Sequence, residues 1–256
     1  MSNKDTYETP DVVSVYARLE GLQKPEATIL RELEHRLKSM EMLDVGVGGG
    51  RTTRVFADLV HGYVGIDSSV KMIEACQARA SAFPGKAAFR VCDVADMSVF
   101  QDQSFDFILF SYNGIDYLAH EGRLQAFREM RRVAKKGGVL CFSTHNLRSL
   151  FGPALPRWST NPVKFLYRIA RYVLLLCAES PFRRLANERY AIIDDGAHES
   201  RLTTYYVLPE EQLRQLADSG FCNVRIFGLE TGKEVRGMSK IGRTRDRWLY
   251  FLCEVD

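Results

Sequence analysis

The fold is decided by Leu43-Asp44-Val45-Gly46-Val47-Gly48-Gly49-Gly50, a glycine-rich stretch in a chain of 256 residues. Residues 42–45 are a short apolar run of the kind that forms a buried strand. A helix is predicted over residues 51–60. The glycines between the two allow a tight turn at the helix N-terminus, where a ligand can approach the backbone closely. The stretch therefore predicts a strand, a ligand-binding turn and a helix in succession.

Strands and helices continue to alternate after this turn. Apolar runs predict strands at 62–67, 88–92, 107–112 and 139–144. Helices are predicted at 70–82, after the N-cap residue Ser69, and at 121–134. Alternation of this kind produces a parallel sheet with helices on both faces. The fold class is therefore α/β, with a doubly wound sheet.

Two segments lie outside this alternation. Amphipathic helices are predicted within residues 11–40, and residues 147–202 hold four of the eight prolines, with helix candidates at 162–178 and 181–189. The alternation resumes with a helix at 209–219 and strands at 223–227 and 248–255. We therefore divide the chain into a helical N-terminal lid (1–40), a ligand-binding α/β domain (41–146 and 203–256) and a mostly helical substrate-cap insertion after the fifth strand (147–202).

Acidic residues stand at the ends of three successive predicted strands. Asp67 ends the second strand, 21 residues after Gly46, where a carboxylate can accept both hydroxyls of a ribose. Asp93 follows the third strand, and Asp44 lies in the first. Open α/β sheets bind their ligands at the carboxyl edge of the strands. These positions predict a nucleoside-containing ligand at that edge.

In this combination the sequence resembles a class I S-adenosylmethionine-dependent methyltransferase. The matching stretches are 43–50, 65–69 with Met72-Ile73, Asp93-Val94, 104–108 and 136–140. The resemblance covers about residues 40–146 and returns over about 206–256. It implies a Rossmann-like sheet with an antiparallel last strand, S-adenosylmethionine as cofactor and S-adenosylhomocysteine as product.

The resemblance also implies which residues contact the cofactor. Gly46, Gly48 and Gly50 would form its turn, with Gly46 and Gly48 against the methionine part. Asp44 would either orient the turn or meet the cofactor's amine through water. The remaining contacts are Asp67 to the ribose, Ser68 and Met72 beside the adenine, Asp93 and the Val94 amide at the adenine amine, and Phe110 or Ser111 beside the sulfonium.

The residues after the fourth strand restrict the acceptor. Ser111-Tyr112-Asn113-Gly114 lacks the Asn/Asp-Pro-Pro-aromatic motif of methyltransferases that act on exocyclic base amines or glutamine amides. It also lacks the cysteine of the pyrimidine C5 enzymes. We therefore expect an enzyme that methylates oxygen or nitrogen of a small metabolite or natural-product intermediate, with carbon as a further option.

Candidate acceptor-side residues follow from their positions. His145 comes directly after the fifth strand, and His198 lies in a polar loop that returns from the insertion. Each is a candidate general base or substrate ligand, with a structural hydrogen-bonding role as the alternative. Residues expected around the acceptor are Tyr16, Tyr112, Asn113, Asn146 and Tyr206.

The charge distribution leaves other acceptors open. The net charge of +3 argues against a nucleic-acid partner. However, residues 148–189 sum to +6 and residues 232–247 to +4, so the rest of the chain sums to −7. These segments either form a solvated basic surface or attract an anionic acceptor. RNA or a protein is an alternative acceptor, and the basic, apolar segment 162–178 resembles an interfacial helix that would suit a lipid-linked substrate.

Composition and cysteine spacing bear on the compartment. The chain is 46% hydrophobic and 26% charged, as in soluble globular proteins. The six cysteines form no CxxC pair and no zinc-ligand spacing. No secretory signal or bilayer-length apolar run is present. We therefore expect a cytoplasmic protein without a metal, and the sequence leaves its oligomeric state open.

Overall fold

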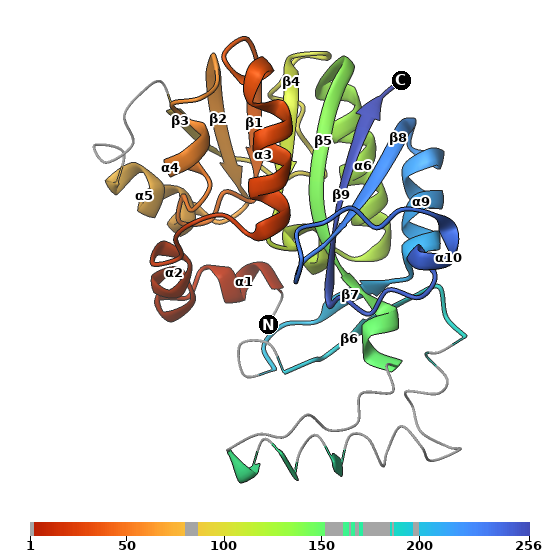
Figure 1. The fold of residues 1–256 in the computed structure, drawn as a ribbon. Coiled ribbons are helices and arrows are strands. Elements are labelled where there is room, and N and C mark those ends of the chain that lie inside the picture. The colour runs from red at the N-terminus through yellow and green to blue at the C-terminus, as the bar shows by residue number, and fades with distance from the viewer. Residues whose placement is uncertain are drawn as a thin grey trace.

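The computed structural model describes residues 3–79, 87–151, 161–163, 165–166, 169–170, 185, 187–196 and 200–256. Parallel strands form the part of the sheet that contains the glycine turn (Figure 1). Their order is β3-β2-β1-β4-β5. The strands are β1 (Glu41–Val45), β2 (Gly62–Asp67), β3 (Ala87–Val91), β4 (Phe105–Phe110) and β5 (Ala134–Asn146).

Antiparallel strands complete the sheet beyond β5. The last strand, β9 (Trp248–Val255), pairs antiparallel with β5 and with β8 (Phe221–Gly228). The described strands make one sheet of nine. The predicted Rossmann-like sheet, mostly parallel with an antiparallel last strand, is thereby confirmed.

A short hairpin of β6 (Tyr190–Ile193) and β7 (Thr204–Val207) extends the sheet past the end of β4. His145 of β5 pairs with Tyr206 of β7 and with Trp248 of β9, so these two strands flank opposite edges of β5. The sequence analysis predicted neither strand of this hairpin. The aromatic and β-branched residues of β7 suit a strand, but its partner β5 lies about 60 residues earlier.

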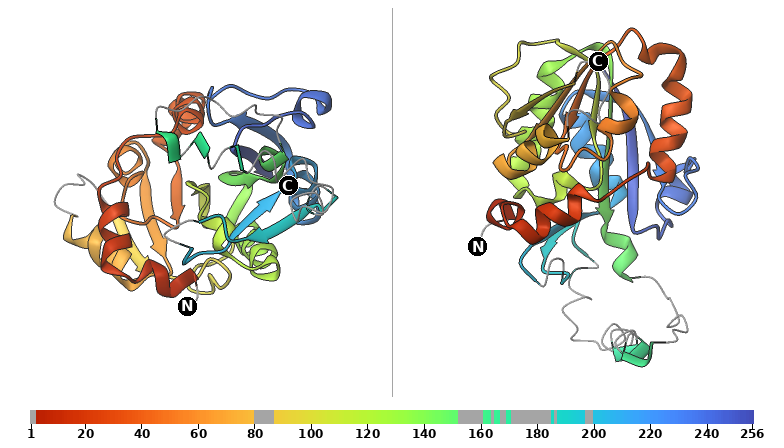
Figure 2. Two further views of the ribbon diagram at one scale, coloured as in Figure 1. Left: turned by 90° about the horizontal axis from the view of Figure 1, so that it is seen from below. Right: turned by 90° about the vertical axis from the view of Figure 1, so that its left-hand side faces the viewer.

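Helices cover both faces of the sheet (Figures 1 and 2). One face packs against α6 (His120–Val133) and α9 (Pro209–Asp218) through side chains such as Phe127 and Leu216. The other face packs against α3 (Lys24–Leu37) and α4 (Thr53–Phe56), where Ile29 and Phe56 are buried. Further helices in the described part of the chain are α5 (Val70–Ala78), η2 (Gly114–Tyr117), η3 (Leu147–Phe151) and α10 (Met238–Ile241).

The helix predicted over 51–60 is reduced to the single turn of α4. Arg51 and Thr52 point into the protein, where Arg51 pairs with Glu26 and Thr52 donates a hydrogen bond to Asp44. Most of the helix candidates at 162–178 and 181–189 lie outside the described residues. No helix in the described part of the chain is long and apolar enough to cross a membrane.

Two N-terminal helices, α1 (Asn3–Tyr7) and α2 (Pro10–Ala17), lie across the carboxyl edge of the parallel strands (Figures 1 and 2). The end of α2 is in very close contact with the glycine turn. A Cβ placed on Gly49 would lie 2.4 Å from the Cα of Ala17 and 2.6 Å from its backbone nitrogen. Only glycine at position 49 therefore lets α2 approach the turn this closely.

We expect Gly49→Ala to displace α2, to lower the free energy of unfolding by about 1–3 kcal/mol and to weaken cofactor binding, because the new methyl group overlaps backbone atoms. Urea denaturation and calorimetric titration measure the two effects. Gly122→Ala is the matched control: its Cβ would meet nothing closer than 3.9 Å, so it should stabilise α6 by about 0.5–1 kcal/mol. Equal effects of the two substitutions would contradict the close approach.

Candidate active site

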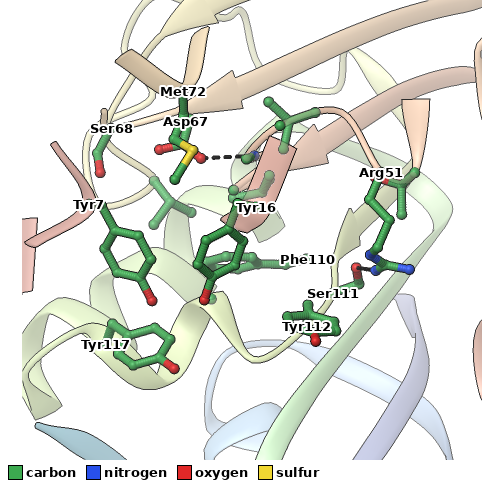
Figure 3. A pocket seen from close by; sticks show the side chains of 18 of the residues that line it. Tyr7, Tyr16, Arg51, Asp67, Ser68, Met72, Phe110, Ser111, Tyr112 and Tyr117 are labelled. Atoms are coloured by element: carbon green, nitrogen blue, oxygen red, sulfur yellow. Dashed lines mark hydrogen bonds between the residues drawn. The ribbon is translucent and has the colours of Figure 1, made fainter. Parts of the chain in front are cut away.

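A pocket lies at the carboxyl edge of β1, β2 and β4, beneath α1 and α2 (Figure 3). It brings together most of the residues predicted to bind the cofactor. Those that line it are Gly46, Gly48, Asp67, Ser68, Met72, Asp93, Val94, Phe110 and Ser111. Tyr16 and Tyr112, predicted on the acceptor side, line it as well.

The glycine turn forms one wall of the pocket. Gly46, Gly48 and Gly50 have φ values of +62°, +54° and +84°, in the left-handed region that favours glycine. A Cβ on Gly46 would approach the Phe110 ring to 2.9 Å. Glycine at these positions therefore permits both the turn and the close packing of β4 against it. Gly46 and Gly48 line the pocket, whereas Gly50 does not.

Asp44 lies behind the turn and outside the pocket lining. Its carboxylate is buried and accepts hydrogen bonds of 2.5 Å from the hydroxyls of Thr52 and Tyr63. Burial raises the pKa of Asp44 to about 6. These contacts correspond to the first of the two roles considered for Asp44, the orientation of the turn.

Asp67 connects the end of β2 to the glycine turn. Its Oδ2 accepts a 3.0 Å hydrogen bond from the Gly48 amide, and its Oδ1 accepts one of 2.9 Å from the Ser69 amide. Burial raises the pKa of this carboxyl above its ordinary value. Figure 3 shows Asp67 with Ser68 and Met72 at one end of the pocket. The carboxylate is thus fixed where a ribose hydroxyl pair can donate to it.

Asp93 and Val94 line the pocket after β3. Asp93 Oδ1 accepts a 2.9 Å hydrogen bond from the Ala95 amide, which fixes the carboxylate beside its own turn. Met72 reaches the pocket from α5, whose N-cap Ser69 accepts a 3.1 Å hydrogen bond from the Met72 amide. A polar edge and an apolar side chain are therefore available for an adenine ring.

The chain leaves β4 through a strained turn at the other end of the pocket. Tyr112 and Asn113 have φ values of +56° and +61°, and a consecutive pair of non-glycine residues rarely adopts this conformation. Such strain costs about 1–3 kcal/mol per residue and is concentrated at functional sites. Before the turn, Ser111 Oγ accepts a 2.8 Å hydrogen bond from Arg51.

Tyrosine rings enclose this end of the pocket (Figure 3). Tyr7 of α1 lies 5.6 Å from Tyr16 of α2 and 5.3 Å from Tyr117 of η2, between ring centroids. Tyr16 in turn lies 6.3 Å from Tyr112. Burial raises the pKa values of Tyr7, Tyr16 and Tyr117 above the ordinary tyrosine value, at which the hydroxyl is already protonated at neutral pH.

Arg51 was not among the predicted site residues, although it directly follows the glycine turn. Its guanidinium forms two 2.7 Å hydrogen bonds to the buried Glu26 carboxylate and one of 2.8 Å to the Gly21 carbonyl. Tyr250 of β9 donates a further hydrogen bond to Glu26 at 2.9 Å. This ion pair ties α3 and its preceding loop to the pocket. The sequence analysis also missed Tyr7 and Tyr117.

The remaining predicted acceptor-side residues lie outside the pocket lining. His145 is buried at the end of β5, where its Nδ1 lies 2.7 Å from Asp116 Oδ2 and its Nε2 lies 3.4 Å from Asn113 Nδ2. Tyr206 packs against His145, with ring centroids 4.8 Å apart. The Asn146 amide donates to two backbone carbonyls, those of Thr244 and Asp246. His198 lies outside the described residues.

In the part of the chain that the structure describes, no group of three or more His, Cys, Asp or Glu side chains is placed to hold a metal ion. The same part fits S-adenosylmethionine. The glycine turn faces the pocket through Gly46 and Gly48, and a Cβ on these residues would take up space that the bare backbone leaves open. Beside the turn, the Asp67 carboxylate is held by two backbone amides. The cofactor's methionine part and ribose each therefore have a matching surface.

Comparison with known proteins gives a family match over the same region. Residues 42–138 match the model of the methyltransferase domain family. A curated relative, the ubiquinone biosynthesis O-methyltransferase of Pelagibacter ubique, is 29% identical over 119 residues, which are 46% of this chain and 47% of the relative. The matched region thus spans about half the length of that relative.

Solved structures share the fold at low sequence identity. A S-adenosylmethionine-dependent methyltransferase from Mesorhizobium loti has a TM-score of 0.61 and 20% identity, covering 90% of this chain and 97% of its own. The CcbJ methyltransferase from Streptomyces caelestis has a TM-score of 0.63 and 16% identity, covering 98% of each chain. The N-methyltransferase NodS from Bradyrhizobium japonicum, in complex with S-adenosylhomocysteine, has a TM-score of 0.56 and 13% identity, covering 97% of this chain and 98% of its own.

We expect Asp67→Ala to weaken S-adenosylmethionine binding about 10- to 100-fold, because hydrogen bonds to a charged group contribute about 1.5–3 kcal/mol. Isothermal titration calorimetry measures the dissociation constant. Asp58→Ala, at an exposed position before β2, is the matched control and should bind as the wild type does. An unchanged affinity of Asp67→Ala would contradict the assignment of the ribose site.

The family match contains the glycine turn, Asp67 and Asp93, which are the residues that build the pocket. The sheet, mostly parallel with an antiparallel β9, belongs to a fold that this chain shares with solved methyltransferases. Residues 42–138 therefore match a methyltransferase domain, and the chain has the fold of S-adenosylmethionine-dependent methyltransferases.

Proposed function

We propose that the protein transfers the methyl group of S-adenosylmethionine to an oxygen or nitrogen atom of a small molecule. The observation that carries this proposal is the cover over the pocket. Tyr7 and Tyr16, from the helices α1 and α2 that lie across the carboxyl edge, line the same pocket as the glycine turn. An acceptor must therefore reach the methyl group within a confined, aromatic space, which suits a small molecule better than a polymer.

The pocket residues act by positioning. The bound cofactor supplies an electrophilic methyl carbon on a sulfonium sulfur, so the protein needs no nucleophile of its own. Alignment of acceptor and methyl group accounts for much of the rate in such a displacement. The faces of Tyr16 and Tyr112 also attract a cationic group at this end of the pocket. Relatives named for O-methyl and N-methyl transfer support the two proposed acceptor atoms.

The test is transfer of a radiolabelled methyl group from S-adenosylmethionine to a fractionated metabolite extract. We expect micromolar cofactor binding and label in a low-molecular-weight fraction, with both lost in Gly46→Val, because a side chain there meets Phe110 at 2.9 Å. Label that appears only in protein or RNA would contradict the small-molecule proposal. Absence of cofactor binding at millimolar concentration would contradict the activity itself.

A lipid-linked acceptor is a second candidate, supported by one exposed surface. Val163 and Leu166 are 72% and 64% exposed and lie three residues apart in a helical segment, on one side of it. Apolar side chains that face solvent next to basic residues are typical of segments that rest on an anionic membrane surface.

We expect Val163→Ser/Leu166→Ser to reduce co-sedimentation with vesicles of phosphatidylglycerol and phosphatidylcholine by about 10-fold or more, because each buried apolar side chain contributes about 1.5–3 kcal/mol. Val99→Ser, at another exposed valine, should leave sedimentation unchanged. Failure of the wild-type protein to sediment with these vesicles would exclude this candidate.

A further inference from the structure

We propose that Asn3 and Arg201 are positioning residues that hold α1 and the start of α2 across the cofactor pocket, and that their contacts set how fast the cofactor enters and its product leaves. The inference goes beyond the proposed function, because it concerns exchange of S-adenosylmethionine and S-adenosylhomocysteine and holds for any acceptor. The sequence analysis singled out neither residue.

Helix α1 crosses the pocket between two attachments (Figure 1). The first is at its end, beside the start of α5. There the Ser69 hydroxyl donates a 3.2 Å hydrogen bond to the Tyr7 carbonyl, and the Val70 amide donates one of 2.8 Å to the Glu8 carboxylate. The second attachment is at the other end of α1, through Asn3. Both Asn3 and Tyr7 line the pocket, so α1 lies over it between the two.

Asn3 pairs with the backbone of Thr203, the residue before β7. Its Oδ1 accepts a 3.1 Å hydrogen bond from the Thr203 amide, and its Nδ2 donates one of 3.0 Å to the Thr203 carbonyl. The same Nδ2 donates a 2.9 Å hydrogen bond to the Tyr117 carbonyl of η2. A reciprocal pair of this kind needs a donor and an acceptor on one planar group, which an amide side chain has. Asn3 therefore joins α1 to two segments that are distant in the sequence.

Arg201 holds the start of α2 from the same side. Its guanidinium forms a 2.6 Å ion pair with Asp11 of α2, and its carbonyl accepts a 3.1 Å hydrogen bond from the Thr6 hydroxyl of α1. Leu202, next to it, is 1% exposed, and the residues of β7 that follow are buried. Residues 201–203 are thus anchored on the sheet. We call their contacts with Asn3, Thr6 and Asp11 the latch.

Helix α1 depends on such contacts for its position. It has five residues, and helices shorter than about 12–15 residues are marginal on their own. No described residue of α1 belongs to the buried apolar core. Hydrophobic packing therefore contributes little to its position, and polar contacts at its two ends hold it in place.

The latch consists of interactions that open easily. The side chains of Asp11 and Arg201 are 60% and 28% exposed, and an ion pair in water is weak because solvent replaces each partner. The hydrogen bonds between Asn3 and Thr203 are also exposed to solvent. Segments held by exposed hydrogen bonds open more readily than the core. The end of α2 is held differently, by the close contact of its backbone with the glycine turn. Opening is therefore confined to α1 and the start of α2.

Opening of the latch matters for the cofactor because of where α1 lies. Asn3 and Tyr7 line the pocket from one side, and the glycine turn lines it from the other. A cofactor bound against the turn lies between them, so its passage beneath α1 requires the latch contacts to break. Asp11 and Arg201 lie outside the pocket lining. They can therefore influence the cofactor only through α1 and α2, which separates a latch from an ordinary cofactor contact.

The first experiment measures exchange of S-adenosylhomocysteine by stopped-flow mixing. We expect Asn3→Ala to raise the association and dissociation rate constants together, each about 10-fold, because three hydrogen bonds are lost. The dissociation constant should change less than about 2-fold, since a gate affects entry and exit alike. Arg18→Gln, at an exposed position at the end of α2, is the control. Unchanged rates, or a rise in the dissociation rate alone, would overturn the latch.

The second experiment is a double-mutant cycle on the ion pair. Asp11→Asn and Arg201→Gln should each raise both rate constants about 2- to 5-fold, and the double variant should exceed neither, because all three break the same contact. Added salt should raise the rates of the wild type more than those of the variants, since it screens an exposed ion pair. Effects that multiply in the double variant would show that the two residues act independently, and would overturn the pairing.

The third experiment follows the latch itself by hydrogen exchange. The Thr203 amide, which donates to Asn3, reports whether the latch is closed. We expect this amide to be protected in the wild type, more strongly with S-adenosylhomocysteine bound, and unprotected in Asn3→Ala. Exchange at the unprotected rate in the loaded wild type would overturn the latch alone. Absence of S-adenosylhomocysteine binding would instead contradict the proposed function.

Discussion

The buried ion pair between Arg51 and Glu26 is the interaction on which the geometry of the pocket depends. The two side chains are 7% and 0% exposed and share two hydrogen bonds of 2.7 Å. A buried pair of this kind contributes little net stability compared with apolar residues, because both charges lose their hydration. The pair instead fixes the relative positions of the segments that it joins. Arg51 also holds the Gly21 carbonyl and the Ser111 hydroxyl, so one guanidinium joins the N-terminal helices, the glycine turn and the end of β4.

The strained turn after β4 is a consequence of this arrangement. Ser111 is fixed by Arg51, and the Tyr112 ring lies 5.1 Å from the same guanidinium. On the far side, the Asn113 amide donates a 2.8 Å hydrogen bond to the Ser143 hydroxyl of β5. Left-handed residues persist where the surrounding contacts over-determine the backbone. The contacts on both sides therefore fix the backbone of this turn beside the pocket.

The sequence was sufficient to predict where a residue lies whenever that position follows from its place on a strand. Parallel strands bring their carboxyl ends to one edge, so the glycine turn, Asp67 and Asp93 could be placed around one pocket before any contact was known. His145, predicted to follow the fifth strand, lies within the last residues of β5 and outside the pocket lining. These predictions depend on local patterns, each only a few residues long.

Residues that reach the site through tertiary packing could not be found in this way. Tyr7 lines the pocket because α1 and α2 lie across it, and α2 is allowed there by the contact of Gly49 with Ala17. Asp116 meets His145 because η2 packs against β5. The β6–β7 hairpin depends on pairing with a strand about 60 residues earlier, which no local pattern records. In each of these contacts, the hydrophobic periodicity of one segment gives no information about the segment that it packs against.

The two buried networks on either side of the turn also pair the buried carboxylates Glu26 and Asp116. Glu26 is neutralised by Arg51, and Asp116 by Arg123 with His145 beside it. Carboxylates held in this way are directed at their partners, and neither of them lines the pocket. Tyr7 and Tyr16 line the pocket from α1 and α2, and burial raises their pKa values further above neutral pH, so this cover adds aromatic surface without charge.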